Sequence, residues 1–328
     1  MDTGPLCALD LLAPEYRGEL SDQNITFGSL FGNGILLYGS SGSGKSSLAF
    51  QCALNCAAGH APSIASPTRD LDNVGQVHPR VVVCCHRSVP HTKAPKPQSS
   101  MDALDEETLD RIEFVYVETL ADVRRHCAEL FDFTTESQRA SGSPAKMPPP
   151  TLIVVEDDGL SDAAISIGGN SSIDAKLSYS KTVALLESTT SYIRTQGDQW
   201  PGLRLHAASY ILVSNIAASI GLAAVSELPF SPISVLGEVM PCAAASSFFD
   251  FPGVVGPNHY RVHLQQRLPT LQPSLRQLRD GASLVPQCGY WFGYRLDADQ
   301  LTPVTPLQEV QLKPTDATAA RQGDTAHW

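Results

Sequence analysis

The sequence predicts an α/β fold built on a doubly wound, mostly parallel β-sheet with antiparallel strands at its C-terminal edge. Three observations predict this fold. Short apolar runs recur along the first two thirds of the chain, helical patterns separate these runs, and the last third carries alternating, aromatic-rich segments. Continuous apolar runs are typical of parallel strands that are covered on both faces.

The first predicted element is a strand–loop–helix unit. Residues 34–38, GILLY, form a short apolar run, and the glycine-rich segment GSSGSGKSS follows at 39–47. Apolar residues then recur on one helical face from Leu48 onwards, and Gly59 is typical of a helix C-terminal stop. We therefore expect a loop that opens a helix near Gly44.

This loop matches the phosphate-binding pattern G-x-x-x-x-G-K-S/T without a gap. Its glycines let backbone N–H groups point into one concavity, the lysine reaches the β- and γ-phosphates, and the following hydroxyl binds Mg²⁺. The sequence thus predicts ATP and Mg²⁺ as cofactors. The expected nucleotide-binding residues are Gly39, Ser40, Ser41, Gly42, Ser43, Gly44, Lys45, Ser46 and Ser47, with Lys45 also catalytic and Ser46 also a metal ligand.

Further strands and helices alternate after this unit. Residues 80–88, RVVVCCHRS, predict a strand, and a short acidic helix, a strand at 112–117 and an amphipathic helix at about 119–131 follow. Stretches rich in Pro, Ser and Gly predict flexible insertions at about 90–105, 134–150 and 161–175.

A run of three acids ends the next predicted strand. Residues 151–155, TLIVV, lead into Glu156, Asp157 and Asp158. Acids at the C-terminal end of a parallel strand lie where open α/β sheets place their ligands. Each of the three could face the metal, and we prefer Asp157 as a catalytic residue and metal ligand.

The remaining segments complete the predicted domain plan. Helical spacing that includes Leu177 predicts a helix at 176–196, and ASYILVSN predicts a buried strand at 208–215. Strand candidates follow at 254–268, 275–281 and 288–297. We expect an N-terminal extension at 1–30, a core domain at 31–300 and a polar, disordered tail at 301–328.

Composition limits the possible partners and the compartment. A net charge of −11 means that the whole molecule does not attract nucleic acid, so DNA contact requires a local surface such as 267–279 or a partner. The eight cysteines show no metal-binding spacing, which indicates buried thiols in a reducing compartment. Residues 207–225 lack charge but are interrupted by polar residues and glycine, so we expect a soluble chain without a membrane partner.

Several segments together resemble the RecA/Rad51-type recombinase ATPases. The general marks are the loop at 39–46, LIVVEDD at 152–158 and ILVSN at 211–215. VVVCCHRSVP, LDRIEFVYVETLADVRRHCAEL and YWFGYRLDAD are more similar to the divergent Rad51 paralogues that associate with SWIM zinc-finger proteins in the Shu complex. The likeness runs in order along most of residues 31–300.

The resemblance implies a RecA-like P-loop ATPase core and a place in homologous recombination DNA repair. It implies a SWIM zinc-finger protein and a Rad51-type recombinase as partners, contact with single-stranded DNA through the complex, and a nuclear location. It also implies that Asn215 contacts the nucleotide as a sensor, although an asparagine there is equally suited to a turn.

The sequence departs from this family at one catalytic position. Its ATPases carry a glutamate after the second core strand, whereas CCHRSVPH has no acid there. His86 is a candidate base and Arg87 a candidate γ-phosphate contact, and oligomerisation could also supply the missing group in trans. Without a positioned base, ATP binding with weak hydrolysis is the leading hypothesis. The alternatives are a DNA-stimulated ATPase active on its own, or a RecA-like scaffold or P-loop phosphotransferase outside DNA repair.

Overall fold

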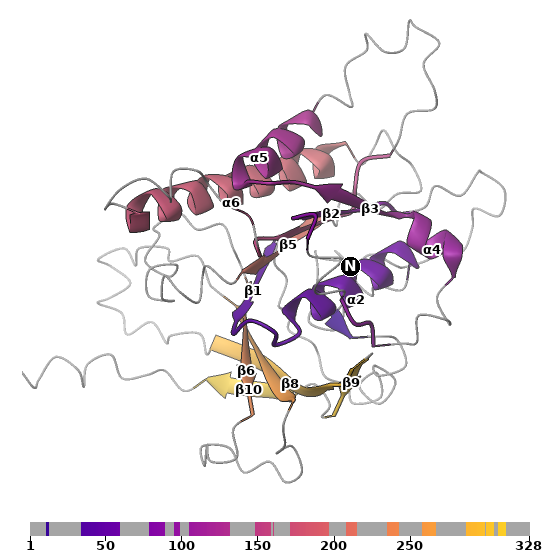
Figure 1. The fold of residues 1–328 in the computed structure, drawn as a ribbon, viewed down its shortest axis with the longest axis vertical. Coiled ribbons are helices and arrows are strands. Elements are labelled where there is room, and N and C mark those ends of the chain that lie inside the picture. The colour runs from indigo at the N-terminus through magenta and orange to yellow at the C-terminus, as the bar shows by residue number, and fades with distance from the viewer. Residues whose placement is uncertain are drawn as a thin grey trace, which may run out of the picture.

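A ten-stranded β-sheet forms the centre of the protein (Figure 1). The structure is a computed structural model that describes residues 11–12, 34–59, 79–88, 95–98, 105–131, 148–158, 160, 171–196, 208–214, 235–242, 258–266, 287–298, 300–304 and 308–312. Its strands are β1 Gly34–Gly39, β2 Val81–Cys85, β3 Ile112–Tyr116, β4 Leu152–Glu156, β5 Ser209–Ser214, β6 Val235–Pro241, β7 His259–Gln266, β8 Gln287–Leu296, β9 Leu301–Pro303 and β10 Gln308–Leu312.

The sheet is parallel over most of its width. The strand order is β10-β8-β7-β6-β1-β5-β4-β2-β3, with β9 paired to β8. From β6 to β3 all neighbours are parallel, whereas β7, β8, β9 and β10 add antiparallel strands at one edge. The predicted α/β class, with a mostly parallel sheet and antiparallel C-terminal edge strands, is confirmed.

Helices cover both faces of the parallel strands. They are α2 Lys45–Ala57, α4 Glu106–Asp110, α5 Leu120–Glu129 and α6 Ser171–Thr195. Helices α5 and α6 lie together on one face, and α2 and α4 lie on the other (Figure 1). Because β1, β5 and β4 are parallel neighbours, their carboxyl ends meet at one edge of the sheet, and helices cover the sheet on both sides.

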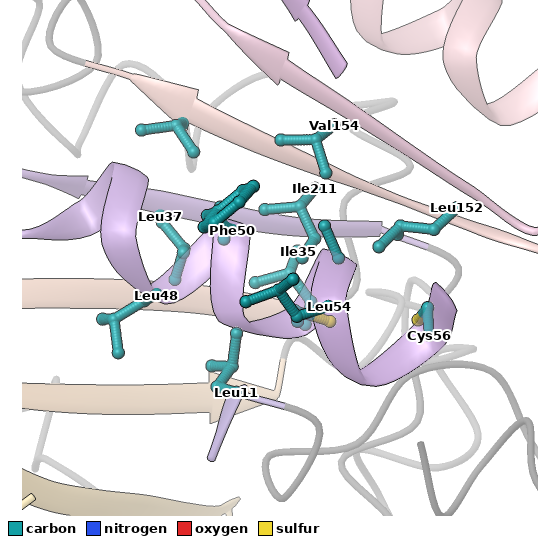
Figure 2. Packing of buried hydrophobic residues seen from close by; sticks show 14 of the residues in the cluster. Leu11, Ile35, Leu37, Leu48, Phe50, Leu54, Cys56, Leu152, Val154 and Ile211 are labelled. Atoms are coloured by element: carbon teal, nitrogen blue, oxygen red, sulfur yellow. The ribbon is translucent and has the colours of Figure 1, made fainter. Parts of the chain in front are cut away.

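Alternation along each strand divides the core into two clusters. In β4, Leu152 and Val154 pack on the α2 side, whereas Ile153 and Val155 pack on the side of α5 and α6. Figure 2 shows the α2 side, where Phe50 and Leu54 lie against strand residues. Residues 152–155 of β4 are all apolar, as expected for a strand that is buried on both faces, and Glu156 is its first polar residue.

Several segments differ from the sequence-based expectation. Strand β6 was not predicted, although it lies centrally between β1 and β7. Strands β9 and β10 lie inside the segment 301–328 that was expected to be a disordered tail, and they gain order by pairing with β8. Helix α6 begins at Ser171, inside the expected insertion at 161–175. The strand candidate at 275–281 lies outside the described residues.

Residues 11–12, which precede the expected core domain, pack against α2. Leu11, in the expected N-terminal extension, is fully buried in the α2 cluster (Figure 2). The side chain of Asn55 in α2 donates a hydrogen bond to the Leu12 carbonyl at 2.9 Å. Among the helices of the described ranges, none combines the length and apolar character that crossing a membrane requires.

Candidate functional site

The glycine-rich loop joins β1 to α2 and depends on glycine at both of its ends. Gly39 has φ +149°, and a Cβ there would lie 2.1 Å from the carbonyl oxygen of Val239 in β6. Gly44 has φ +87° and directly precedes α2. As predicted, the helix starts after Gly44 and ends shortly before Gly59. The two glycines allow the chain to turn sharply at the carboxyl end of a central strand.

The N-terminus of α2 is open to an anion. No side chain caps it, because its N-cap is Gly44, and the first turn contains no acidic residue. The first N–H groups of a helix lack intrahelical acceptors and carry partial positive charge. This end of α2 is therefore suited to bind negatively charged oxygen atoms.

Lys45 places its ammonium group inside the loop. It is buried, and its Nζ donates to the carbonyl oxygens of Gly39 at 3.1 Å and Ser40 at 2.7 Å. The Ser43 hydroxyl lies 3.4 Å from the same nitrogen. These contacts hold the cation where an anion seated in the loop would meet it.

Ser46 connects the loop to the end of β4. Its hydroxyl donates a hydrogen bond to the Glu156 carboxylate, which is buried on the α2 side of the sheet. Burial raises the pKa of Glu156, the hydrogen bond from Ser46 opposes that rise, and the neighbouring Asp158 and Asp157 charges add to it. A serine hydroxyl beside a carboxylate offers oxygen ligands suited to Mg²⁺, directly or through water.

Asp157, the acid preferred from the sequence, faces the other side of the sheet. The hydroxyl of Ser214 in β5 donates to its carboxylate, and both side chains are buried. Burial, followed by the nearby Asp157 charge, raises the pKa of Tyr179 in α6. The carboxylate therefore lies toward α6, and Glu156 is the acid that meets the glycine-rich loop.

A pocket of about 220 Å³ lies over the start of α2. Residues 41–47 form one wall, and Glu156 and Asp158 line it from the end of β4. Val213 in β5 and Leu296 in β8 also line it, and residues 95–96 complete the lining. The pocket thus brings together the uncapped start of α2, two lysines and two acidic residues.

Strand β8 supports the loop from the antiparallel edge. The hydroxyl of Tyr294 donates a hydrogen bond to the Ser43 carbonyl, and Tyr294 is fully buried against Tyr260. Tyr294, Leu296 and Lys96 were not predicted as residues of this site. The aromatic pattern around 290–296 indicated a strand, but no local signal indicated that this strand reaches a loop about 250 residues earlier.

His86 and Arg87 form a separate cluster at the ends of β2 and β3. His86 Nε2 lies 3.2 Å from the Glu118 carboxylate, and Arg87 pairs with the same carboxylate at 2.6 Å. None of these three residues, His86, Arg87 and Glu118, is among those that line the pocket. An acid was expected after β2, whereas Glu118 follows β3 and was not predicted.

Two predicted contacts lie outside the described residues. These are Asn215, the candidate sensor, and the basic surface at 267–279. Over the described ranges, no cluster of three or more His, Cys, Asp or Glu residues could hold a metal by itself.

Six cysteines of the described ranges are free thiols, and one of them, Cys242, is only partly buried. Cys52, Cys56, Cys84, Cys85 and Cys127 are buried. Burial raises the pKa of Cys85 to about 11, followed by a smaller effect of the Glu156 charge. Two other residues of α2, Phe50 and Ala53, form a Phe-x-x-Ala pattern in the sequence, and both are also buried in the α2 cluster.

Comparisons with known proteins add no family assignment. No protein-family model matches the chain, and a search of curated proteins finds no significant match.

Proposed function

We propose that the chain binds Mg²⁺–ATP with residues 39–47 around the phosphates. Lys45 would contact the β- and γ-phosphates, and the open N–H groups of α2 would add hydrogen bonds. The observation that carries this proposal is the hydrogen bond from Ser46 to Glu156, because it joins the phosphate-loop hydroxyl to an acid at the end of β4. Bound Mg²⁺ would neutralise charge on the phosphates.

The same chemistry assigns roles to two acids. Glu156 would orient Mg²⁺ beside Ser46, and the positive charge of the ion would favour the ionised form of this buried carboxyl group. Asp157, bonded to Ser214, would support the fold and not the metal. In this proposal the residues around the metal are Ser46 and Glu156.

We further propose a RecA-like P-loop core that acts as a partner subunit in homologous recombination DNA repair. Support comes from the sequence resemblance, and from a mostly parallel sheet whose glycine-rich loop follows a central strand. A SWIM zinc-finger protein and a Rad51-type recombinase would be its partners, and single-stranded DNA would be contacted through the complex in the nucleus.

Weak hydrolysis is part of this proposal. His86 follows β2, where the resembling family carries a glutamate, and its imidazole contacts Glu118 outside the residues that line the pocket. A general base must come within hydrogen-bond reach of the attacking water. ATP would then act mainly by stabilising the folded or assembled form through mass action.

A second candidate is a DNA-stimulated ATPase that works on its own. Asp158 favours it, because its side chain lines the pocket next to Glu156 and could take a proton from water. A P-loop phosphotransferase would use the same phosphate loop, but we find no observation that favours it.

Nucleotide binding and ATP turnover test the proposal together. Binding of a fluorescent ATP analogue and phosphate release are measured for the wild type and Lys45→Ala, with and without single-stranded DNA. Binding that is lost in Lys45→Ala, with turnover at the level of that variant, supports the proposal. Turnover that DNA raises several-fold in the wild type alone supports the second candidate. If neither protein binds nucleotide, both candidates fail.

A further inference from the structure

A second lysine reaches the pocket from a segment that the sequence places in an insertion. Residues 95–98 lie along the start of α2, and the backbone N–H of Lys96 donates to the Ser47 hydroxyl at 2.9 Å. Two residues later, the buried Gln98 N–H donates to the Gln51 side chain at 2.9 Å. These two bonds fix the backbone of Lys96 against the helix that carries the glycine-rich loop.

The same segment is bonded to the antiparallel edge. The ammonium group of Lys96 donates to the carbonyl oxygen of Asp297, just after β8, at 2.6 Å. The N–H of Leu301 in β9 donates to the Pro97 carbonyl at 3.1 Å. Lys96 thus lies between the start of α2 and the turn that joins β8 to β9.

The charges around the pocket suggest a use for this second cation. Its lining includes two lysines, Lys45 and Lys96, and two acids, Glu156 and Asp158. Lys45 directs its ammonium into its own loop. A divalent cation near Glu156 and Asp158 would offset the negative charge of these acids. The two lysines would then be left to attract phosphate oxygens in the pocket.

We propose that Lys96 is a second phosphate-binding residue and that it links bound nucleotide to the turn between β8 and β9. This inference rests on the proposed nucleotide site. An ammonium group carries three N–H donors, so Lys96 can hold the Asp297 carbonyl and a phosphate oxygen together. Its backbone is fixed by Ser47, and only the side chain has to adjust.

Three variants test this role by titration with Mg²⁺–ATP. Lys96→Met removes the charge and keeps much of the side-chain length, Lys96→Arg keeps the charge, and Lys181→Met is the matched control. Lys181 is exposed on α6, on the opposite face of the sheet. We expect Lys96→Met to weaken binding about 10- to 100-fold, as for other hydrogen bonds from a charged group. Lys96→Arg should stay within a few-fold of the wild type.

Salt dependence and stability separate binding from a purely structural role. In Lys96→Met the affinity should fall less steeply with salt than in the wild type, because one charge contact is missing. An affinity within about twofold of the wild type would overturn the inference. It would also be overturned if Lys181→Met bound Mg²⁺–ATP as weakly as Lys96→Met. A third contradicting result would be a Lys96→Met protein whose melting temperature without nucleotide is lower than that of the wild type while the salt dependence of its affinity is unchanged. A wild type that does not bind Mg²⁺–ATP would instead refute the proposed function itself.

Discussion

Helices α2 and α5, which lie on opposite faces of the parallel sheet, begin in opposite ways. On one face, α2 begins at Gly44 without a side-chain cap or a first-turn acid, and Glu156 is a buried acid whose pKa is raised. On the other face, Thr119 and Asp122 form a complete capping box at the start of α5. The capping box gives the Asp122 N–H of α5 a side-chain acceptor, whereas no side chain caps the start of α2.

The same contrast separates two neighbouring carboxyl groups. Glu156 accepts a hydrogen bond from the loop residue Ser46, and Asp157 accepts one from the strand residue Ser214. Successive positions place the two carboxyl groups on opposite faces of the sheet, which is why we propose a ligand role for Glu156 and a structural role for Asp157. Variants at the pocket on the α2 face should therefore lower nucleotide affinity, whereas variants on the α5–α6 face should lower stability and leave nucleotide affinity unchanged.

The largest expected effect lies in the core of the α5–α6 face. Leu186→Ala removes a fully buried side chain and should lower the free energy of unfolding by about 2–5 kcal/mol. The affinity of the folded protein for Mg²⁺–ATP should stay the same. Urea unfolding and nucleotide titration below the transition measure the two quantities.

Leu177→Ala is the matched control in the same helix. Leu177 was predicted to share the apolar face of α6, but its side chain is 51% exposed. Its replacement should change the free energy of unfolding by no more than about 0.5 kcal/mol. Equal losses for the two leucines would contradict the division of α6 into a buried and an exposed side.

A next-largest effect is expected in the loop on the α2 face. Gly39→Ala places a Cβ against the Val239 carbonyl in a left-handed backbone, so both stability and nucleotide affinity should fall. We expect a stability loss of at least about 2 kcal/mol. Gly59→Ala provides the control, because φ is +72° there but nothing lies within 4 Å of the added Cβ.

Gly59→Ala should therefore carry only the backbone cost of about 1–2 kcal/mol and leave nucleotide affinity unchanged. Thermal unfolding and titration of the folded protein compare the two variants. An unchanged affinity in Gly39→Ala would mean that the loop conformation described here is not the one that binds.

A smaller effect is expected at the capped helix. Thr119→Ala removes the side chain that accepts from the Asp122 N–H at 3.1 Å, and stability should fall by about 1 kcal/mol. Nucleotide affinity should not change, since α5 lies on the face opposite the pocket. A reduced affinity at equal stability would break the proposed separation of the two faces.

The smallest effect concerns the pH dependence of the same cap. The hydrogen bond from Thr119, followed by weaker backbone and Arg125 contributions, lowers the pKa of Asp122 from its ordinary value. A lowered pKa gives stability that is present above the unfolded-state pKa and is lost as the pH falls through the folded-state pKa. The stability difference between wild type and Asp122→Asn should therefore shrink when the pH falls below about 4.

Acid titration of unfolding free energies measures this difference. A difference that grows toward low pH would mean that the ionised carboxylate does not stabilise the cap.

Much of this architecture could be predicted because its signals are local. The apolar runs marked β1, β2, β4 and β5, and the loop pattern marked the start of α2 at Gly44. Strand β6, VLGEVMP, was not predicted, because its sequence alone lacks a clear strand pattern. Gly237 interrupts its apolar pattern, and a Cβ there would lie 2.5 Å from the Leu37 side chain. That glycine reflects close packing against β1, which only the assembled sheet reveals.

The choice between Glu156 and Asp157 could not be made from the sequence for a related reason. A strand exposed on one face alternates polar and apolar residues, and that alternation identifies which side chains share a face. Strand β4 is apolar on both faces, so its pattern assigns no side to the acids that follow. Lys96 could not be predicted as a pocket residue, because residues 95–98 meet the β8–β9 turn and β9 only in the folded chain.

The central claim is that the acid on the α2 face, and not its neighbour, serves the nucleotide site. The most direct test titrates Glu156→Gln and Asp157→Asn with ATP in the presence of Mg²⁺ and of EDTA. We expect Glu156→Gln to lose most of the gain in affinity that Mg²⁺ provides, by about 10- to 100-fold, and Asp157→Asn to keep it. If Asp157→Asn loses that gain and Glu156→Gln retains it, the assignment of the two faces is wrong.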